Sequence, residues 1–133
     1  MPPPRLLPAL DDTNRPYWTG GRDGCLLIER CAICDRWQHP PEGRCAACGG
    51  EVVATPVSGR GTVFTYTVNA HQFHPEVPPP YVIAIVTLDE QADLRVVTNI
   101  VDCDEATLRV GLPVRVSFEE HGERAVPVFV PAT

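Results

Sequence analysis

The stretch CAICDRWQHPPEGRCAAC, residues 31–48, decides how the first half of this chain folds. It contains two Cys-x-x-Cys pairs, Cys31 with Cys34 and Cys45 with Cys48, separated by ten residues. Each pair lets two sulfur atoms approach one ion from a tight turn, and two such turns complete a tetrahedral shell. Because four thiolates leave no open position on Zn²⁺, the spacing predicts a structural zinc ribbon that folds as it binds metal.

Other chemistries also use this residue set. A rubredoxin-like iron site would use the same four thiolates for electron transfer, and a redox dithiol would use a single pair. One metal explains both pairs more economically than two dithiols do. His39 lies near the pairs as an alternative ligand, whereas Cys25 and Cys103 lie beside apolar runs and are expected to be packed thiols.

The sequence on either side of the ribbon divides the chain into three parts. Residues 1–24 are proline-rich and then polar, which predicts a tail. Within the tail, residues 16–18 (PYW) are expected to begin a helical turn that docks on the body. The zinc ribbon is expected over residues 25–57 and a β-rich domain over residues 58–133.

Five runs rich in β-branched residues follow Gly61. Between the third and the fourth, Asp102 or Asp104 is expected to cap a single helical turn that Gly111 ends. Five strands with one short helix in this place match an OB-fold barrel. The predicted fold is therefore mainly β, an N-terminal zinc ribbon followed by a five-stranded OB-fold barrel with one short helix. The runs cover residues 62–69, 81–88, 94–101, 113–118 and 126–130.

The second of these runs, residues 81–88, is apolar on both faces. One face fills the barrel, and the other must be covered by the ribbon, by the tail or by another protein. The segment before it, residues 69–80 (NAHQFHPEVPPP), is rich in proline, which keeps it out of the sheet and lowers the entropy lost on binding. Because the first inter-strand loop of an OB fold commonly contributes to the binding face, this segment is a candidate ligand or partner loop.

Two further groups near this loop are candidates for chemistry or recognition. His71 and His74, with Glu76 beside them, are candidates for an acid/base pair or for metal ligands, and the alternatives are polar recognition and plain solvent exposure. Arg60 stands between two glycines, where its guanidinium would be available to a phosphate.

Composition narrows the function of the 133-residue chain. All 11 basic residues are arginine, so Schiff-base lysine chemistry and the Walker lysine are excluded. No nucleophile motif and no Gly-rich phosphate loop occurs, which favours a binding or organising subunit.

The net charge of −6 disfavours nucleic acid as a partner, although a single-stranded nucleic-acid-binding OB module remains the alternative. No apolar run is long enough for a signal peptide or a membrane span, so a cytoplasmic protein without a membrane partner is expected.

Several motifs together resemble the acyl-CoA-associated family that joins a rubredoxin-like zinc ribbon to an OB fold. Besides the cysteine pairs with residues 40–41 (PP) between them, they are the stretches 16–18 (PYW), 24–31 (GCLLIERC), 58–64 (SGRGTVF), 80–82 (PYV), 86–90 (VTLDE) and 111–116 (GLPVRV). The resemblance covers residues 16–130 and implies that Cys31, Cys34, Cys45 and Cys48 hold the zinc. Asp35, which follows Cys34, stands where such turns commonly have glycine.

The resemblance also implies a function. Members of this family are accessory subunits of thiolase-superfamily proteins, and some are fused to, or cut from, a MaoC-like enoyl-CoA hydratase. For this chain, the resemblance implies a non-catalytic but required subunit of a lyase complex. That complex would be an aldolase that cleaves a β-hydroxyacyl-CoA in steroid side-chain degradation. The alternative is a scaffold that bridges a thiolase to another acyl-CoA enzyme.

No catalytic residue is carried over from the family, because its catalysis is attributed to the thiolase-like partner. We assign the candidate loop and its neighbours to the partner surface or to the acyl-CoA channel that the complex would form. These residues are Arg60, His71, Phe73, His74 and Tyr81.

Overall fold

The computed structural model describes residues 6–70 and 80–132. The first half contains the elements α1 (Arg15–Thr19), the 3₁₀ helix η1 (Gly20–Asp23), β1 (Leu27–Cys31), β2 (Trp37–Gln38) and β3 (Val52–Pro56). The second half contains β4 (Arg60–Asn69), β5 (Tyr81–Leu88), β6 (Arg95–Ile100), β7 (Pro113–His121) and β8 (Arg124–Pro131).

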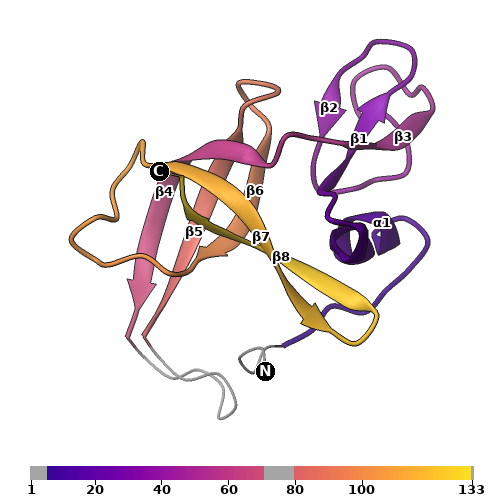
Figure 1. The fold of residues 1–133 in the computed structure, drawn as a ribbon. Helices are drawn as coiled ribbons and strands as arrows, with labels where there is room; N and C mark the ends of the chain where they lie inside the picture. The colour runs from indigo at the N-terminus through magenta and orange to yellow at the C-terminus, as the bar shows by residue number, and fades with distance from the viewer. Residues whose placement is uncertain (1–5, 71–79, 133) are drawn as a thin grey trace.

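These strands form two separate β structures, which lie side by side in Figure 1. The first is a three-stranded sheet in the order β2-β1-β3, and the second is a closed barrel in the order β4-β5-β6-β8-β7. All neighbours in the barrel pair antiparallel except β6 and β8, which pair parallel at Ile100 and Phe129. The mainly β fold with a five-stranded barrel is confirmed.

The barrel is filled by alternate side chains of its strands. Val63, Val86, Val96 and Phe129 are each no more than 1% exposed. A bulge at Phe64 shifts the register between β4 and β5, so Val63 pairs with Val86 but Thr65 pairs with Ile85. Inward and outward positions on β4 therefore change parity at the bulge.

The helical turn expected between β6 and β7 is a single turn. The Leu108 N–H donates to the Asp104 carbonyl at 3.1 Å, and the turn extends no further into a helix. Asp102, expected as a cap, instead has a φ of 52°, in the left-handed region. The one α-helix among the described residues is α1, which precedes the ribbon.

Helix α1 docks through Tyr17, which is 4% exposed. Its ring packs edge-on against Trp18 at 4.8 Å and against His39 of the ribbon at 4.5 Å between centroids. No helix in the described part of the chain is long and apolar enough to cross a membrane.

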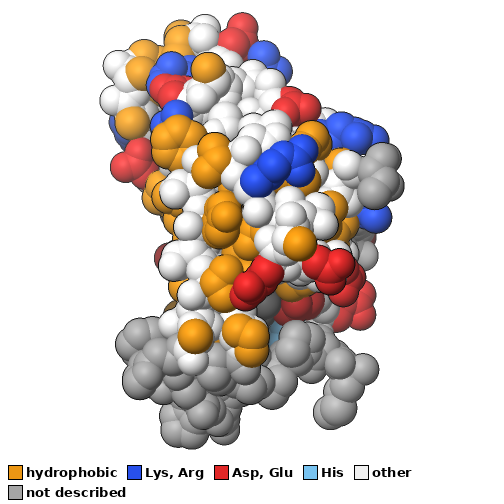
Figure 2. Space-filling view, turned by 90° about the vertical axis from the view of Figure 1, so that its left-hand side faces the viewer, with side chains coloured by type: hydrophobic (Ala, Val, Ile, Leu, Met, Phe, Trp, Pro, Cys, Tyr) orange, Lys and Arg blue, Asp and Glu red, His pale blue; other side chains and the backbone are white. Residues whose placement is uncertain are grey.

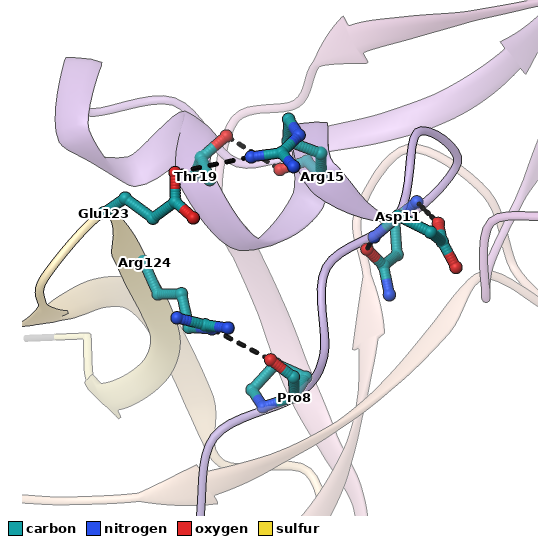
Figure 3. A network of polar contacts seen from close by, with 7 residues as sticks. Pro8, Asp11, Arg15, Thr19, Glu123 and Arg124 are labelled. Atoms are coloured by element: carbon teal, nitrogen blue, oxygen red, sulfur yellow. Dashed lines mark hydrogen bonds and ion pairs between the residues drawn. The ribbon is translucent and has the colours of Figure 1, made fainter.

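The segment before α1 is held by the hairpin between β7 and β8, as Figure 3 shows. The Arg124 Nε donates to the Pro8 carbonyl at 2.9 Å, and Arg15 pairs with Glu123 at 3.3 Å. Asp11 closes its own turn by accepting from the N–H groups of residues 13 and 14. These contacts fix the N-terminal segment against the end of the barrel.

The ribbon is joined to the turn between β5 and β6. The Trp37 N–H donates to Gln91 Oε1 at 3.0 Å, and Gln91 Nε2 donates to the Trp37 carbonyl at 2.9 Å. Arg36 and Asp93 form an ion pair beside them. The Gln91 amide thereby occupies the free backbone edge of β2 as another strand would.

Candidate metal centre

Two similar turns position the four cysteines of the motif. In the first, the Asp35 N–H donates to the Cys31 carbonyl at 3.1 Å; in the second, the Gly49 N–H donates to the Cys45 carbonyl at 2.9 Å. The residue after each pair has a positive φ, 62° at Asp35 and 74° at Gly49. Aspartate therefore adopts the backbone conformation that glycine adopts in the second turn, and the turn forms without glycine.

The four sulfur atoms form one cluster. All four lie within 4.8 Å of one another, with Cys31 and Cys48 at 3.5 Å and Cys34 and Cys45 at 3.7 Å. A tetrahedron of sulfurs about 2.3 Å from Zn²⁺ has edges of about 3.8 Å, whereas a disulfide would place sulfurs about 2 Å apart. The cysteine cluster fits a structural zinc ion, and the zinc ribbon prediction is confirmed.

The backbone around the cluster favours thiolates at two of its positions. The Cys34 N–H hydrogen bond lowers the pKa of Cys31 to about 6, and the Cys48 N–H lowers the pKa of Cys45. At Cys34 and Cys48 the N–H groups of the following turn act in the same direction, but burial and bonds to neighbouring thiols outweigh them and raise each pKa. Metal binding displaces protons from cysteine ligands, so Zn²⁺ would hold all four residues as thiolates and join the two turns in its structural role.

A buried carboxylate supports the second turn from behind. Glu29, 7% exposed, accepts hydrogen bonds from the Glu42 and Gly43 N–H groups at 2.8 and 3.0 Å. It also accepts from Gln38 Nε2 at 2.8 Å, and Gln38 Oε1 accepts from the Ala46 N–H. The segment between the cysteine pairs is thus held by side chains of β1 and β2.

The other nitrogen and sulfur candidates near the ribbon lie outside the sulfur cluster. His39 packs on Tyr17, and burial lowers its pKa to about 4, so it is a neutral side chain of the ribbon core. The Cys25 Sγ contacts the Asp23 carbonyl at 3.7 Å, and Cys103 lies after β6. Both of these cysteines are partly buried thiols.

The remaining candidates belong to the barrel. Arg60 is exposed at the start of β4, and Tyr81 is half-buried at the start of β5. His71, Phe73, His74 and Glu76 lie outside the described residues.

The outer side of β4, β5 and β6 carries exposed apolar side chains. Phe64 is 48% exposed, Ile83 38% and Val97 67%. Ile85 of β5 pairs with Val97 of β6 and with Thr65 of β4, which follows Phe64. Ile83 lies two residues before Ile85 and therefore on the same face of β5. The four apolar side chains thus share the outer face of the sheet. Figure 2 shows hydrophobic side chains running down the side of the molecule that faces left in Figure 1. We call Phe64, Ile83, Ile85 and Val97 the outer apolar face.

Sequence reasoning missed two sets of supporting residues. Gln91 contacts Trp37 across 54 positions of sequence, and Arg115 is the cross-strand neighbour of Arg60. A hydrogen-bonding residue in a predicted turn carries no signal for so distant a partner. The pairing of Arg60 with Arg115 depends on the β4–β7 register, which a single sequence does not specify.

Comparison with known proteins places both halves of the chain. Residues 18–54 match the family of the rubredoxin-like zinc ribbon domain of ChsH2, and residues 54–119 match that of the ChsH2 C-terminal OB-fold domain. A solved chain described as "Ltp2-ChsH2(DUF35) aldolase" superposes with a TM-score of 0.85 at 35% identity. The match covers 96% of this chain and all of that one.

Three sequence relatives have related descriptions. A probable enoyl-CoA hydratase alpha subunit of Thermomonospora curvata is 35% identical over 96% of this chain, which spans 40% of that protein. A DUF35 domain-containing scaffold protein of Methanocaldococcus jannaschii is 34% identical over 77% of this chain and 75% of its own length. The 3-oxo-4,17-pregnadiene-20-carboxyl-CoA hydratase alpha subunit of Mycobacterium tuberculosis is 31% identical over 77% of this chain and 32% of its own length.

The chain thus spans well under half of the two hydratase subunits and most of the scaffold protein. Both family matches agree with the observed arrangement of a four-cysteine ribbon followed by a closed barrel. The chain belongs to the ChsH2 family of proteins that join a rubredoxin-like zinc ribbon to an OB fold.

Proposed function

We propose that this chain is an accessory subunit that binds a thiolase-superfamily protein and helps form its acyl-CoA channel. The reaction of the complex is retro-aldol cleavage of a β-hydroxyacyl-CoA in steroid side-chain degradation. The proposal places the complex in the cytoplasm, with a MaoC-like hydratase as a further partner. It also keeps the division into a tail over 1–24, a ribbon over 25–57 and an OB fold over 58–133.

The observation that carries this proposal is the structural match to the chain of the Ltp2-ChsH2(DUF35) aldolase. It extends over 96% of this chain, so it includes the ribbon, the barrel and their arrangement. The steroid substrate class is supported by the pregnadiene-carboxyl-CoA named for the Mycobacterium tuberculosis relative.

The chemistry of the described residues agrees with a supporting role. Within residues 6–70 and 80–132, the four cysteines are the one group of three or more side chains placed to hold a metal, and their shell is closed. Such a centre stabilises a fold and offers no position for a substrate. The acid/base alternative at His71 and His74 remains a prediction, because both lie outside the described residues.

The outer apolar face is the surface that we assign to the thiolase-like partner. Phe64, Ile83 and Val97 are exposed and Ile85 is partly exposed on three neighbouring strands of the barrel, and the candidate loop joins two of these strands, β4 and β5. Apolar side chains gathered on one face mark a protein interaction surface more often than scattered ones do.

The experiment is co-expression of the full chain with a thiolase-like protein, followed by mass measurement of the complex and an acyl-CoA cleavage assay. We expect a stable complex and cleavage only when both proteins are present. Val97→Glu should weaken assembly at least tenfold, because it buries a charge in the interface. Val53→Glu is the matched control, since Val53 is 54% exposed against 67% for Val97 but lies on β3 of the ribbon sheet. A partner that is fully active alone would overturn the proposal.

The second candidate is a scaffold that bridges a thiolase to another acyl-CoA enzyme. It is supported by the DUF35 domain-containing scaffold protein, 75% of whose length this chain matches. A scaffold would bind two enzymes at once without changing the activity of either alone. Mass measurement of the mixture with both enzymes separates the two candidates, since a bridge gives a three-protein species.

A further inference from the structure

Two arginines of neighbouring barrel strands face each other on the outer surface. Arg60 of β4 and Arg115 of β7 are cross-strand partners, and both side chains are exposed. The Val116 N–H donates to the Gly59 carbonyl at 2.7 Å, so the adjacent Arg60–Arg115 pair is the non-hydrogen-bonded kind. Side chains are closest in such pairs, with Cα atoms about 4.5 Å apart. Like charges placed opposite each other in this way destabilise a strand pair.

This repulsion is not relieved by ion pairs within the described part of the chain. Neither guanidinium takes part in an ion pair or a side-chain hydrogen bond among those residues. The Asp89 N–H donates to the Arg60 carbonyl at 3.0 Å, so Asp89 lies on the other side of Arg60, but its carboxylate is not among these ion pairs either. The Glu90 carboxylate is also near, because its Oε2 accepts from the Ser58 N–H at 2.8 Å. The two guanidinium groups are therefore available to an anion, with the carboxylates of Asp89 and Glu90 nearby.

The backbone at Arg60 is held from both sides. Its N–H donates to Ser58 Oγ at 3.2 Å, and its carbonyl accepts from Asp89. A Cβ at Gly59 would lie 2.4 Å from Val116 Cγ1, and a Cβ at Gly61 would lie 2.3 Å from the Thr87 carbonyl oxygen. Glycine on both sides thus lets β4 approach its two neighbours closely, and the base of the arginine side chain is fixed.

We propose that Arg60 and Arg115 together bind a phosphate group of the coenzyme A portion of an acyl-CoA. Guanidinium groups bind phosphate through paired hydrogen bonds, and two of them can share the oxygens of one phosphate. The assignment to coenzyme A rests on the proposed function, whereas phosphate binding itself rests on the arginine pair.

The test is calorimetric titration of the full zinc-loaded chain at low salt with coenzyme A and, separately, with inorganic pyrophosphate. Arg60→Gln and Arg115→Gln should each weaken binding about tenfold, because each removes a charge-assisted contact. Arg44→Gln, which neutralises an exposed arginine of the ribbon, should leave affinity unchanged. Asp89→Asn should strengthen binding, because it removes one of the two nearby negative charges. The proposal is overturned if Arg60→Gln and Arg115→Gln bind the probes as tightly as Arg44→Gln does. It is also overturned if the native chain binds neither coenzyme A nor pyrophosphate at millimolar concentration.

Two further measurements identify the phosphate and separate this proposal from the proposed function. Dephospho-coenzyme A should bind weakly if the arginine pair holds the 3′-phosphate, and as tightly as coenzyme A if the pair holds the diphosphate. Either result supports the site, provided that Arg60→Gln and Arg115→Gln weaken the binding of coenzyme A. If no thiolase-like protein assembles with the chain but coenzyme A still binds in an arginine-dependent way, the phosphate site stands and the proposed function fails. Loss of partner assembly in Arg60→Gln with unchanged affinity for coenzyme A would show a protein contact instead, and would refute the phosphate site.

Discussion

Replacing Gln91 with alanine tests how firmly the ribbon is joined to the barrel. The substitution removes two hydrogen bonds, at 3.0 and 2.9 Å, to the backbone N–H and carbonyl of Trp37. Trp37 is 9% exposed, so water replaces these bonds poorly. Each bond contributes about 0.5–1.5 kcal/mol, and a buried backbone group left without a partner costs about 1–3 kcal/mol. We expect the free energy of unfolding of the ribbon to fall by about 2 kcal/mol.

The assay is urea unfolding of the zinc-loaded chain, followed by tryptophan fluorescence, with hydrogen exchange at the Trp37 amide. With a denaturant slope of about 2 kcal/mol per molar, the midpoint should fall by about 1 M, and the Trp37 amide should exchange faster. Asp89→Ala is the control in the same turn. The Asp89 side chain is exposed and takes part in no ion pair among the described residues, so its loss should cost less than about 0.5 kcal/mol. An unchanged midpoint and unchanged exchange in Gln91→Ala would refute the reasoning.

Three further predictions concern the ribbon. Removing the metal with a chelator should unfold the ribbon and shift the emission of Trp37 to the red. Native mass measurement should give one zinc ion per chain. Unchanged emission after metal loss would contradict the structural role of the metal. His39 has a pKa of about 4 in the folded chain because burial disfavours its charge, although Glu29 opposes this, so protons bind the unfolded state more readily. The part of the stability that depends on His39 should therefore fall by about 1 kcal/mol between pH 6.5 and 5.5, and His39→Phe should reduce the pH dependence by that amount in matched urea titrations. Asp35→Val should lower the free energy of unfolding of the ribbon by about 1–2 kcal/mol, because the φ of residue 35 is 62°. Asp35→Gly should change this free energy by less than about 1 kcal/mol. Equal urea midpoints for the two variants would contradict this account.

The features that sequence predicted well are those set by short-range constraints. Two Cys-x-x-Cys turns need only local geometry, so the spacing of residues 31–48 was enough to predict the ribbon and its sulfur cluster. The barrel strands follow from runs of β-branched residues, whose alternate side chains fill one core. Even so, β7 extends to His121, beyond the predicted end at residue 118, because it pairs with β8 along the whole hairpin.

The features that sequence did not predict depend on which distant residues meet. The Gln91–Trp37 contact joins a turn to a strand 54 residues away, and glutamine in a turn is ordinarily a solvated side chain. Asp35 looked like a departure from the usual turn, yet it adopts the left-handed backbone that the turn requires. Of the candidate channel residues, Arg60 and Tyr81 lie on the barrel, and the predictions at His71, Phe73 and His74 lie outside the described residues.

Net charge and local charge lead to different expectations for this molecule. A charge of −6 argues against an extended polyanion, which would cross acidic as well as basic surface. At physiological salt, however, exposed charges act over only about 8 Å, so a small phosphate near Arg60 and Arg115 is influenced mainly by that pair and by the carboxylates of Asp89 and Glu90. A net charge of −6 is therefore compatible with the proposed binding of one phosphate at this pair.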